Sequence, residues 1–450
     1  MNKRTFLKTS SALAGGAVLS RLAACKPTPM KEPLKNWAGN LEYSTSNVHY
    51  PKTVAEVQEA VKKCSKLRGL GSRHSFNKIA DSTENQVCLN EMNKMVSLNK
   101  TSNTVTVEGG MRYGELAPYL HENGYALHNL ASLPHITIAG ACATATHGSG
   151  VKNGNLSTEV SAIEFVNAAG EVINLSREKD GEHFAGAVVG LGALGIVTKL
   201  TLNLQPTFNM KQVVYRNLPM KELEKNFNEI VSAGYSVSLF TDWKNKNINE
   251  VWVKSKAEKG DAAAPAELFG AKIATQNMHP IETESAENCT EQMGVPGPWY
   301  ERMPHFKMGF KPSAGKELQG EYFVPIEHAY EAMMAIEKLQ EKISPHLFIS
   351  EIRTIAADDL WMSPCYKQTC VALHTTWKQE VAEVMNLIPL LEEQLAPFNA
   401  RPHWAKLFTV APSVLQSRYD KLADFKQLIN KYDPNGKFRN EFLSQHLYTT

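Results

Sequence analysis

The sequence predicts an α+β protein in two parts, and three observations support this. Before about residue 206, short segments of alternating apolar residues lie between short helices and glycine-rich turns. From 207 to about 397, longer amphipathic helices lie between strands, which is typical of an α/β domain. The length of 450 residues is sufficient for two domains.

The elements of the first part follow from hydrophobic spacing and from the glycine or proline at their ends. Two alternating runs flank Ala168–Gly170, which predicts a hairpin over residues 160–175. In chain order, the predicted elements are a helix at 53–66, a strand at 101–110, a helix at 113–124, the hairpin and a strand at 195–206.

The second part and the tail are read in the same way. A loop region near 257–300, rich in Ala, Pro and Gly, interrupts the pattern. The predicted elements are helices at 220–234 and 326–343, strands at 237–243, 350–359 and 371–380, and a helix within 425–438 that a Pro-Asn-Gly turn closes.

The N-terminus is predicted to be a targeting segment. A basic start precedes a short apolar run at 11–20, which is too short to span a bilayer. It resembles a twin-arginine export signal with Lys3 at the first arginine position, and residues 22–25 (LAAC) resemble a lipoprotein box. We therefore expect residues 1–25 to be a signal, Cys25 to be lipidated, and the protein to lie in the bacterial cell envelope (periplasm). The alternative is that LAAC arises by chance in a cleavage region.

Residues 26–36 are rich in proline and lysine and are predicted to form a tether. The formal charge of +2 argues against nucleic acid as a partner. Seven cysteines show no disulfide framework, and the pair Cys365–Cys370 has no second pair at zinc-binding spacing. We therefore expect buried thiols and no metal site.

One glycine motif is excluded as a dinucleotide site. Gly190–Gly195 (GLGALG) matches G-x-G-x-x-G, but that motif binds pyrophosphate only between a strand and a helix. The residues after Gly195 predict a strand, so a Rossmann fold and NAD(P) are excluded.

Two other segments fit a long anionic ligand. The turn Gly69–Ser75 carries His74, and residues 137–150 are almost all Gly, Ala, Ser or Thr. Small residues let backbone N–H groups approach a pyrophosphate, and hydroxyls add donors. Residues 137–150 alone also fit a tightly packed core segment, and a lone loop histidine also fits a surface or capping role. Together they indicate FAD bound outside a Rossmann fold.

Several motifs then resemble a known family. They are RGLGSRHSFN (68–77), EGGMRYGEL (108–116), residues 129–150, GLGALGIVTKLTL (190–202), SEIRTIAADD (350–359) and RPHWAKLFT (401–409). They resemble the vanillyl-alcohol oxidase superfamily, and within it alditol (xylitol/sorbitol) oxidases, which are close to aldonolactone oxidases. The likeness extends over about residues 37 to 440. It implies a PCMH-type FAD-binding domain at 37–206, a substrate-binding cap at 207–397, and a C-terminal return to the FAD domain at 398–450.

The resemblance also implies the cofactor contacts. In this family the histidine at the position of His74 bonds covalently to the 8α carbon of the flavin. The residues predicted to bind FAD are Gly71, Ser72, Arg73, His74, Ser75, Ser132, Thr137, Gly140, Thr144, Ala145, Thr146, His147, Gly195, Ile196 and His403.

The substrate residues combine strand spacing with the resemblance. Glu351 and Arg353 are two apart on a predicted strand and share a face, as do His374 and Thr376 on the next. Taken singly, the first pair fits a surface ion pair and Lys406 a solvated lysine. The resemblance instead implies a polyol site.

In that site we expect Arg353 and Lys406 to be catalytic at the C1 hydroxyl. Lys406 could act as base if Arg353 lowers its pKa, because an arginine itself does not deprotonate. The residues expected to bind the polyol are Ser132, Glu351, Arg353, His374, Thr376 and Lys406.

Three functions are compared. The first is an alditol oxidase that oxidises a polyol at C1 to the aldose and reduces O₂ to H₂O₂. The second is an envelope aldonolactone or sugar dehydrogenase that passes electrons to a quinone or cytochrome. The third is a non-catalytic sugar-binding protein, which is disfavoured because His74 and Lys406 are present. A monomer is expected, since one closed core with one FAD requires no partner subunit.

Overall fold

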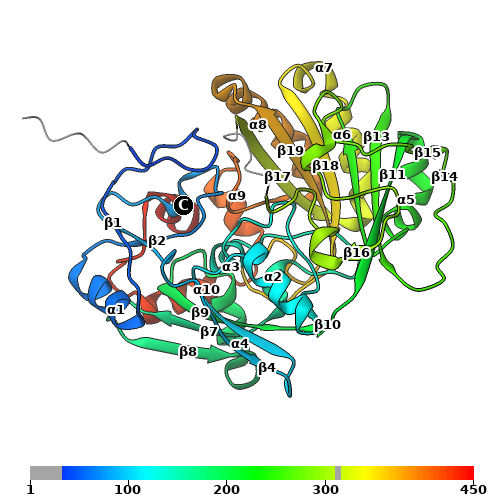
Figure 1. Cartoon of the computed structure of the whole chain (residues 1–450). Helices are drawn as coiled ribbons and strands as arrows, with labels where there is room; N and C mark the ends of the chain where they lie inside the picture. The colour runs from blue at the N-terminus through cyan, green and yellow to red at the C-terminus, as the bar shows by residue number, and fades with distance from the viewer. Residues whose placement is uncertain (1–32, 310–315, 450) are drawn as a thin grey trace, which may run out of the picture. The chain divides into compact units, whose positions relative to one another are not determined.

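The computed structural model describes residues 33–309 and 316–449, so the predictions for the signal segment and Cys25 lie outside the described residues. An antiparallel sheet of five strands organises the first part, in the order β4-β5-β9-β7-β8 (Figure 1). Its strands are β4 (Met95–Asn99), β5 (Thr104–Glu108), β7 (Val160–Val166), β8 (Val172–Ser176) and β9 (Ile196–Asn203).

This sheet tests two of the sequence predictions. β7 and β8 pair as an antiparallel hairpin, as predicted. β9 begins at Ile196, directly after the motif Gly190–Gly195, so a strand and not a helix follows the motif. The helix that the pyrophosphate site of a Rossmann fold requires is therefore absent after this motif.

A small parallel sheet, in the order β1-β3-β2, lies beside helix α1. Helix α1 was predicted and spans Val54–Lys63, and the Thr53 side chain caps it by accepting from the Glu56 backbone N–H at 3.2 Å. The strands are β1 (Val48–His49), β2 (Arg68–Leu70) and β3 (Gln86–Cys88). β2 ends where the glycine turn with His74 begins, so the sheet fixes the start of that turn.

The remaining elements of the first part are helices and one short ribbon. They are α2 (Tyr113–Glu122), β6 (Tyr125–Ala126), α3 (Ile138–Ala143), α4 (Arg177–Val188) and β10 (Gln205–Pro206), with β6 and β10 paired. Helix α2 ends at Glu122, just before Gly124, where the sequence predicts its end.

A large sheet organises the second part, and all of its named strand pairs are antiparallel. Its order is β14-β15-β11-β13-β12-β18-β19-β17-β20, with β16 beside β11. The strands are β11 (Asn209–Pro219), β12 (Ser236–Thr241), β13 (Asn247–Ala257), β14 (Glu267–Leu268), β15 (Ala271–Ile273), β16 (Gly297–Pro298), β17 (Glu317–Pro325), β18 (Leu347–Ile355), β19 (Cys370–Lys378) and β20 (Arg401–Pro402).

Helices cover one face of the large sheet, as Figure 1 shows. They are α5 (Leu223–Val231), α6 (Ala329–Glu337), α7 (Gln340–Ile343) and α8 (Val381–Leu395). The sequence predicts one helix over 326–343, but the structure breaks it between α6 and α7.

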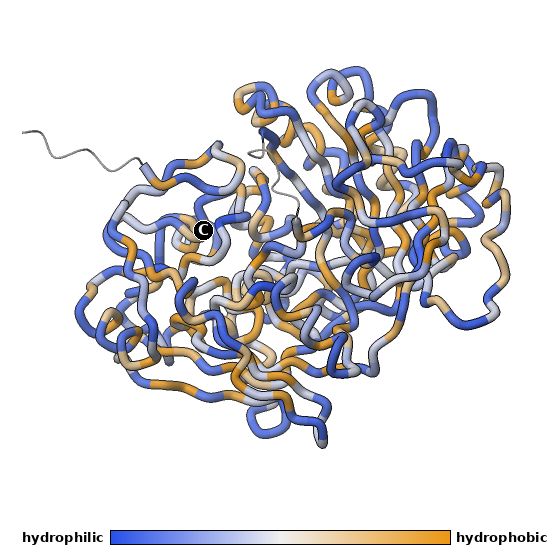
Figure 2. Tube along the Cα trace, in the orientation of Figure 1, coloured by the Kyte–Doolittle hydropathy of each residue, from blue (hydrophilic) through white to orange (hydrophobic). Residues whose placement is uncertain are grey.

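The two faces of the large sheet differ in polarity. Tyr322, Ile352 and Leu373 pack with the helices in one apolar core. Their neighbours Glu321, Glu351 and His374 therefore point to the opposite face, because side chains alternate along a strand. Figure 2 shows this alternation of apolar and polar residues along the strands. The polar face carries the candidate site.

The C-terminal segment returns to the first part of the chain. It contains α9 (Pro412–Ser417), α10 (Leu422–Tyr432) and α11 (Glu441–Leu443), and α10 packs on α4. The predicted turn after α10 closes with a hydrogen bond from Gly436 N to Asp433 O at 3.1 Å.

The chain from Pro33 onward forms one compact unit. The domain limits at residues 206 and 397 therefore stay predictions, although one main sheet ends at Asn203 and the next begins at Asn209. Over the described ranges, no helix combines the length and apolar character needed to cross a bilayer.

Candidate active site

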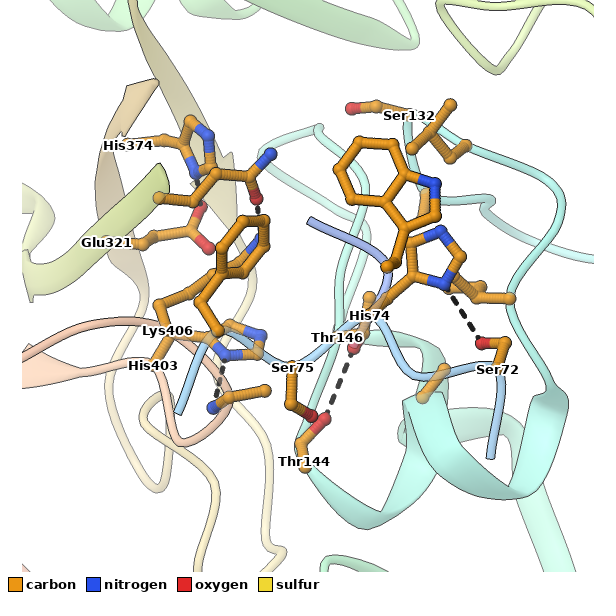
Figure 3. A pocket seen from close by; sticks show the side chains of 18 of the residues that line it. Ser72, His74, Ser75, Ser132, Thr144, Thr146, Glu321, His374, His403 and Lys406 are labelled. Atoms are coloured by element: carbon orange, nitrogen blue, oxygen red, sulfur yellow. Dashed lines mark hydrogen bonds and ion pairs between the residues drawn. The ribbon is translucent and has the colours of Figure 1, made fainter. Parts of the chain in front are cut away.

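A cavity of about 780 Å³ lies where the glycine turn meets the polar face of the large sheet. One wall comes from the turn after β2 and the residues around α3, and the other from β17, β18, β19 and the loop after β20. In Figure 3, Ser72, His74 and Thr144 lie on the loop side, and Glu321, His374 and Lys406 on the sheet side. Small residues thus face ionisable residues across one cavity.

The glycine turn approaches α3 closely. A Cβ added to Gly71 would lie 2.7 Å from Thr137 Oγ1, and one added to Gly140 would lie 2.8 Å from the same atom. Ser72 Oγ also accepts from the Thr137 backbone N–H at 3.3 Å. Thr137 thereby joins the two segments that the sequence predicts to flank one ligand, and no larger residue fits at the contact.

His74 is held in this turn by stacking and by one hydrogen-bonded ring nitrogen. Trp37 stacks on its ring with centroids 5.1 Å apart, and Nδ1 lies 3.1 Å from Ser72 Oγ. The other ring nitrogen, Nε2, is buried without a hydrogen-bond partner. Burial, and then the Lys406 charge, lower the pKa of His74 to about 3, so the ring is neutral. An uncharged imidazole with a free buried nitrogen is suited to bonding a ligand.

The segment after α3 completes the loop wall. Thr144, Thr146 and His147 line the cavity, and the Thr144 and Thr146 hydroxyl oxygens lie 3.4 Å apart. Ala145 adopts a φ of 54°, which turns the chain so that both threonines face the ligand space.

A carboxylate that sequence reasoning did not single out lies at the centre of the sheet wall. Glu321 Oε1 accepts from Arg353 NH2 at 2.8 Å and lies 3.1 Å from His147 Nε2 and 3.4 Å from His374 Nδ1. Burial favours the neutral acid, but His147, His374 and Arg353 together outweigh it and hold the pKa of Glu321 well below its usual range. Glu321 is therefore an anion that contacts residues of both walls.

Strand register aligns the neighbours of Glu321. His374 lies opposite Glu321 on one side and opposite Glu351 on the other, across β17, β19 and β18. Arg353 Nε lies 3.5 Å from Glu351 Oε1, and its NH1 donates to Ser132 Oγ at 3.4 Å. His374 Nε2 lies 3.2 Å from Thr376 Oγ1.

These contacts fix the charges of the sheet wall. Burial favours neutral Glu351, but Arg353 and His305 outweigh it and lower its pKa. Burial also works against the charge on Arg353, yet Glu351 and Glu321 outweigh it and raise its pKa. The pKa of His374 is lowered, first by burial. The wall thus presents a fixed cation between two fixed anions.

Lys406 lies half-buried beside this cluster. Its Nζ donates to Gln319 Oε1 and lies 4.8 Å from the centre of the Phe76 ring. Gln319 is itself held because its amide donates to Glu317. Burial lowers the pKa of Lys406 to about 8, with Arg353 also lowering it and Glu321 opposing. The amine form is therefore accessible near neutral pH.

His403 lies at the base of the sheet wall. Its backbone N–H donates to Glu321 O at 3.0 Å, and its Nδ1 accepts from Ala405 N at 3.1 Å. Burial, and then Lys406, lower its pKa to about 3, so it adds no charge to the cavity.

Most predicted residues line the cavity and a few do not. Those that line it are Gly71, Ser72, Arg73, His74, Ser75, Ser132, Gly140, Thr144, Thr146, His147, Glu351, Arg353, His374, Thr376, His403 and Lys406. Thr137 joins the two loops, and Ala145 shapes the turn. Gly195 and Ile196 do not line the cavity. A Cβ on Gly195 would lie 2.3 Å from Val166 O, so its contact is with the sheet.

Comparisons with known proteins place this site in a family. Residues 45–176 match a family model described as FAD binding domain, and residues 313–446 match one described as D-arabinono-1,4-lactone oxidase. Alditol oxidase of a Streptomyces species is 44% identical over 417 residues, which is 92% of this chain and 99% of that protein. The chain belongs to the alditol oxidase family. It is an FAD-dependent oxidoreductase of the vanillyl-alcohol oxidase superfamily, as its motifs predict.

More distant relatives show how the alditol oxidase family is connected. L-gulono-1,4-lactone dehydrogenase of Mycobacterium tuberculosis is 26% identical, covering 90% of this chain and 97% of that protein. L-gulonolactone oxidase of Mus musculus is 23% identical, covering 92% of this chain and 98% of that protein. The structure of cholesterol oxidase from B. sterolicum aligns with a TM-score of 0.75 at 14% identity, covering 92% of this chain and 96% of that one. This last likeness shows the shared fold alone.

Proposed function

We propose that this protein oxidises a polyol, such as xylitol or sorbitol, at C1 to the aldose, with O₂ reduced to H₂O₂. The observation that carries the proposal is a polar group that faces the small-residue loops across one cavity. It consists of the buried Glu321, Glu351, Arg353 and His374 and the half-buried Lys406. The 44% identity to alditol oxidase supports the substrate class.

The loop wall fits FAD. Gly71 and Gly140 let the turn and α3 approach each other, because a Cβ on either would meet Thr137 Oγ1, and the buried atoms His74 Nε2 and Thr137 Oγ1 have no hydrogen-bond partner. Small residues and an unpaired hydroxyl donor suit a diphosphate. When bound, FAD would accept the hydride that leaves the substrate carbon. We further propose that His74 is bonded covalently to the flavin, since its neutral ring keeps a lone pair for a carbon centre.

The sheet wall would handle the substrate proton. We assign Lys406 as the base that takes the C1 hydroxyl proton, because its pKa of about 8 leaves part of it as the amine near neutral pH. Arg353 stays charged and would stabilise the oxygen as it loses that proton. An arginine does not act as the base itself.

The remaining groups would bind the polyol chain. Each hydroxyl both donates and accepts, and this wall offers both functions. The Glu351 carboxylate accepts, Arg353 donates, and Ser132, His374 and Thr376 do either. A site whose buried polar groups need partners discriminates strongly against substrates that lack those hydroxyls.

The second candidate is a lactone or sugar dehydrogenase that passes electrons to a quinone or cytochrome. The observation that favours it is the C-terminal match to the model described as D-arabinono-1,4-lactone oxidase, together with the lactone dehydrogenase relatives. Export to the cell envelope, lipidation at Cys25 and a monomeric state remain proposals from the sequence alone.

The test is the visible spectrum of the purified protein under nitrogen, before and after xylitol, followed by air. Bleaching of the flavin band that air reverses is the expected result. Bleaching that air does not reverse would indicate the dehydrogenase. A yellow protein that xylitol does not bleach would reject the polyol as substrate, and lactones would be tested next.

A further inference from the structure

The buried Lys254 lies beside the substrate wall, on the same face of the large sheet as Arg353 but outside the cavity lining. It is on β13 and only 1% exposed. Its ammonium faces three acceptors, which are Met303 O at 2.6 Å, Pro304 O at 2.9 Å and His305 Nδ1 at 3.2 Å. An ammonium has three protons to donate, so each has one acceptor. A buried lysine satisfied in this way holds the segment Met303–His305 in place.

The lysine determines which ring nitrogen of His305 carries the proton. Because Nδ1 accepts from Lys254, the proton of the neutral ring lies on Nε2. Nε2 then donates to Glu351 Oε1 at 2.7 Å. Burial, and then the Lys254 charge, lower the pKa of His305 to about 4, which agrees with a neutral ring. Lys254, His305 and Glu351 thus form a chain of hydrogen bonds that starts outside the cavity at Lys254 and reaches it at His305 and Glu351, which both line it.

The same segment also holds Ser132. The backbone N–H groups of His305 and Phe306 both contact Ser132 O, at 3.2 and 3.3 Å. Thr290 fixes the segment from the other side, because its hydroxyl donates to Pro304 O at 2.7 Å. One anchored segment therefore positions two groups of the cavity, Glu351 through a side chain and Ser132 through backbone.

We propose that Lys254 and His305 are positioning residues that orient Glu351 and Ser132 for the polyol and keep Glu351 anionic. The proposal rests on the proposed function, since it assigns Glu351 and Ser132 to the polyol. Lys254 does not face the substrate, so it acts on binding through His305.

Burial and nearby charges set the pKa values of Lys254 and His305. Burial lowers the pKa of Lys254 to about 7, while Glu351 and Cys289 oppose that shift. His305 faces the Lys254, Glu351 and Arg353 charges, of which only Glu351 favours its protonation. Removing the Lys254 charge is therefore expected to raise the pKa of His305.

Variants of the flavin-loaded enzyme separate this role from general packing. Lys254→Met should raise the KM for xylitol by about tenfold or more, with a smaller change in kcat. Lys256→Met is the matched control, on the same strand but exposed, and should behave as wild type. His305→Leu should match Lys254→Met, whereas His305→Gln should recover most of the affinity, because an amide can accept from Lys254 and donate to Glu351.

A substrate-free measurement makes the test independent of turnover. In protein labelled with ¹⁵N-histidine, the His305 ring should take up its second proton at higher pH in Lys254→Met than in wild type. A wild-type KM in both Lys254→Met and His305→Leu, or an unchanged His305 titration, would overturn the proposal. If wild type fails to oxidise xylitol, the proposed function falls, and the titration still decides the role of Lys254.

Discussion

The loop wall and the sheet wall of the cavity hold their ligand-facing atoms in different ways. The loop wall relies on close backbone approach, as at Gly71 and Gly140 against Thr137. The sheet wall relies on buried polar side chains, several of them ionised, that strand register brings together, as where the Glu321 carboxylate lies opposite His374. The loop wall should therefore be sensitive to added volume, and the sheet wall to a change in charge at constant volume. Four substitutions test this contrast, in order of expected effect on turnover.

The largest effect is expected at Lys406. Lys406→Met should lower kcat/KM by about 10²- to 10⁴-fold, because it removes the proposed base. In wild type, kcat/KM should rise with pH to a plateau with a midpoint near 8, since raising the pH converts the ammonium to the amine. The variant should lack this rise while its flavin spectrum is unchanged. A wild-type rate that instead falls above pH 8 would assign the ammonium an electrostatic role.

The second-largest effect is expected at Glu321, which is compared with another buried glutamate, Glu250. Glu321→Gln leaves Arg353 without its closest counter-ion and should cost about 3 to 5 kcal/mol of unfolding free energy, with a large loss of turnover. Glu250→Gln is the control, because burial raises the pKa of Glu250 to about 7 and its side chain accepts from the neutral Trp252 Nε1 at 2.6 Å, with no ion pair to it within 33–309 and 316–449. It should change stability little.

The pH dependence of the unfolding free energy gives a second test of whether the charge of Glu321 matters. The folded pKa of Glu321 lies below its ordinary value of 4.5, so its stabilisation is complete above that value and is lost as the pH falls toward the folded pKa. The gap between wild type and Glu321→Gln in urea unfolding should therefore narrow in acid. A constant gap would show that shape, rather than charge, matters at Glu321.

The third effect concerns volume on the loop wall. Gly71→Ala places a Cβ 2.7 Å from Thr137 Oγ1 and should cost about 1 to 3 kcal/mol, with reduced flavin content after purification. The neighbouring Gly69→Ala meets only Ile196 Cδ1 at 3.7 Å and should lose less flavin. Equal flavin content in the two variants would contradict the close-approach explanation.

The smallest effect on turnover is expected at His74. His74→Ala should retain activity within about tenfold, because the substitution leaves the sheet wall intact. Its flavin should separate from the protein on denaturation, whereas wild-type flavin should stay on the denatured chain and fluoresce with it. Release of wild-type flavin would exclude the covalent bond.

Local signals in the sequence were sufficient to predict the loop wall of the cavity. The glycines and small hydroxyl residues of 69–75 and 137–147 mark close backbone approach directly, because only small residues permit it. The strand that follows Gly195 excluded a Rossmann site by the same local reasoning. The spacing of Glu351 and Arg353 predicted one shared face, and both residues line the cavity.

Only the tertiary structure shows which residues form the centre of the sheet wall. Glu321, His305 and Lys254 lie in segments with no motif, and nothing in their neighbours marks them as polar residues of a buried cluster. Their roles depend on side-chain contacts between residues more than thirty positions apart, such as Glu321 with Arg353 and His305 with Glu351. The sequence by itself determined the family, through motifs that resemble those of its members. It also determined the cofactor loops and the faces of the strands, because these follow from local chemistry and short periodicities. Which buried charges meet was decided by the register of the large sheet, because their pKa values depend on neighbours that only the folded chain supplies.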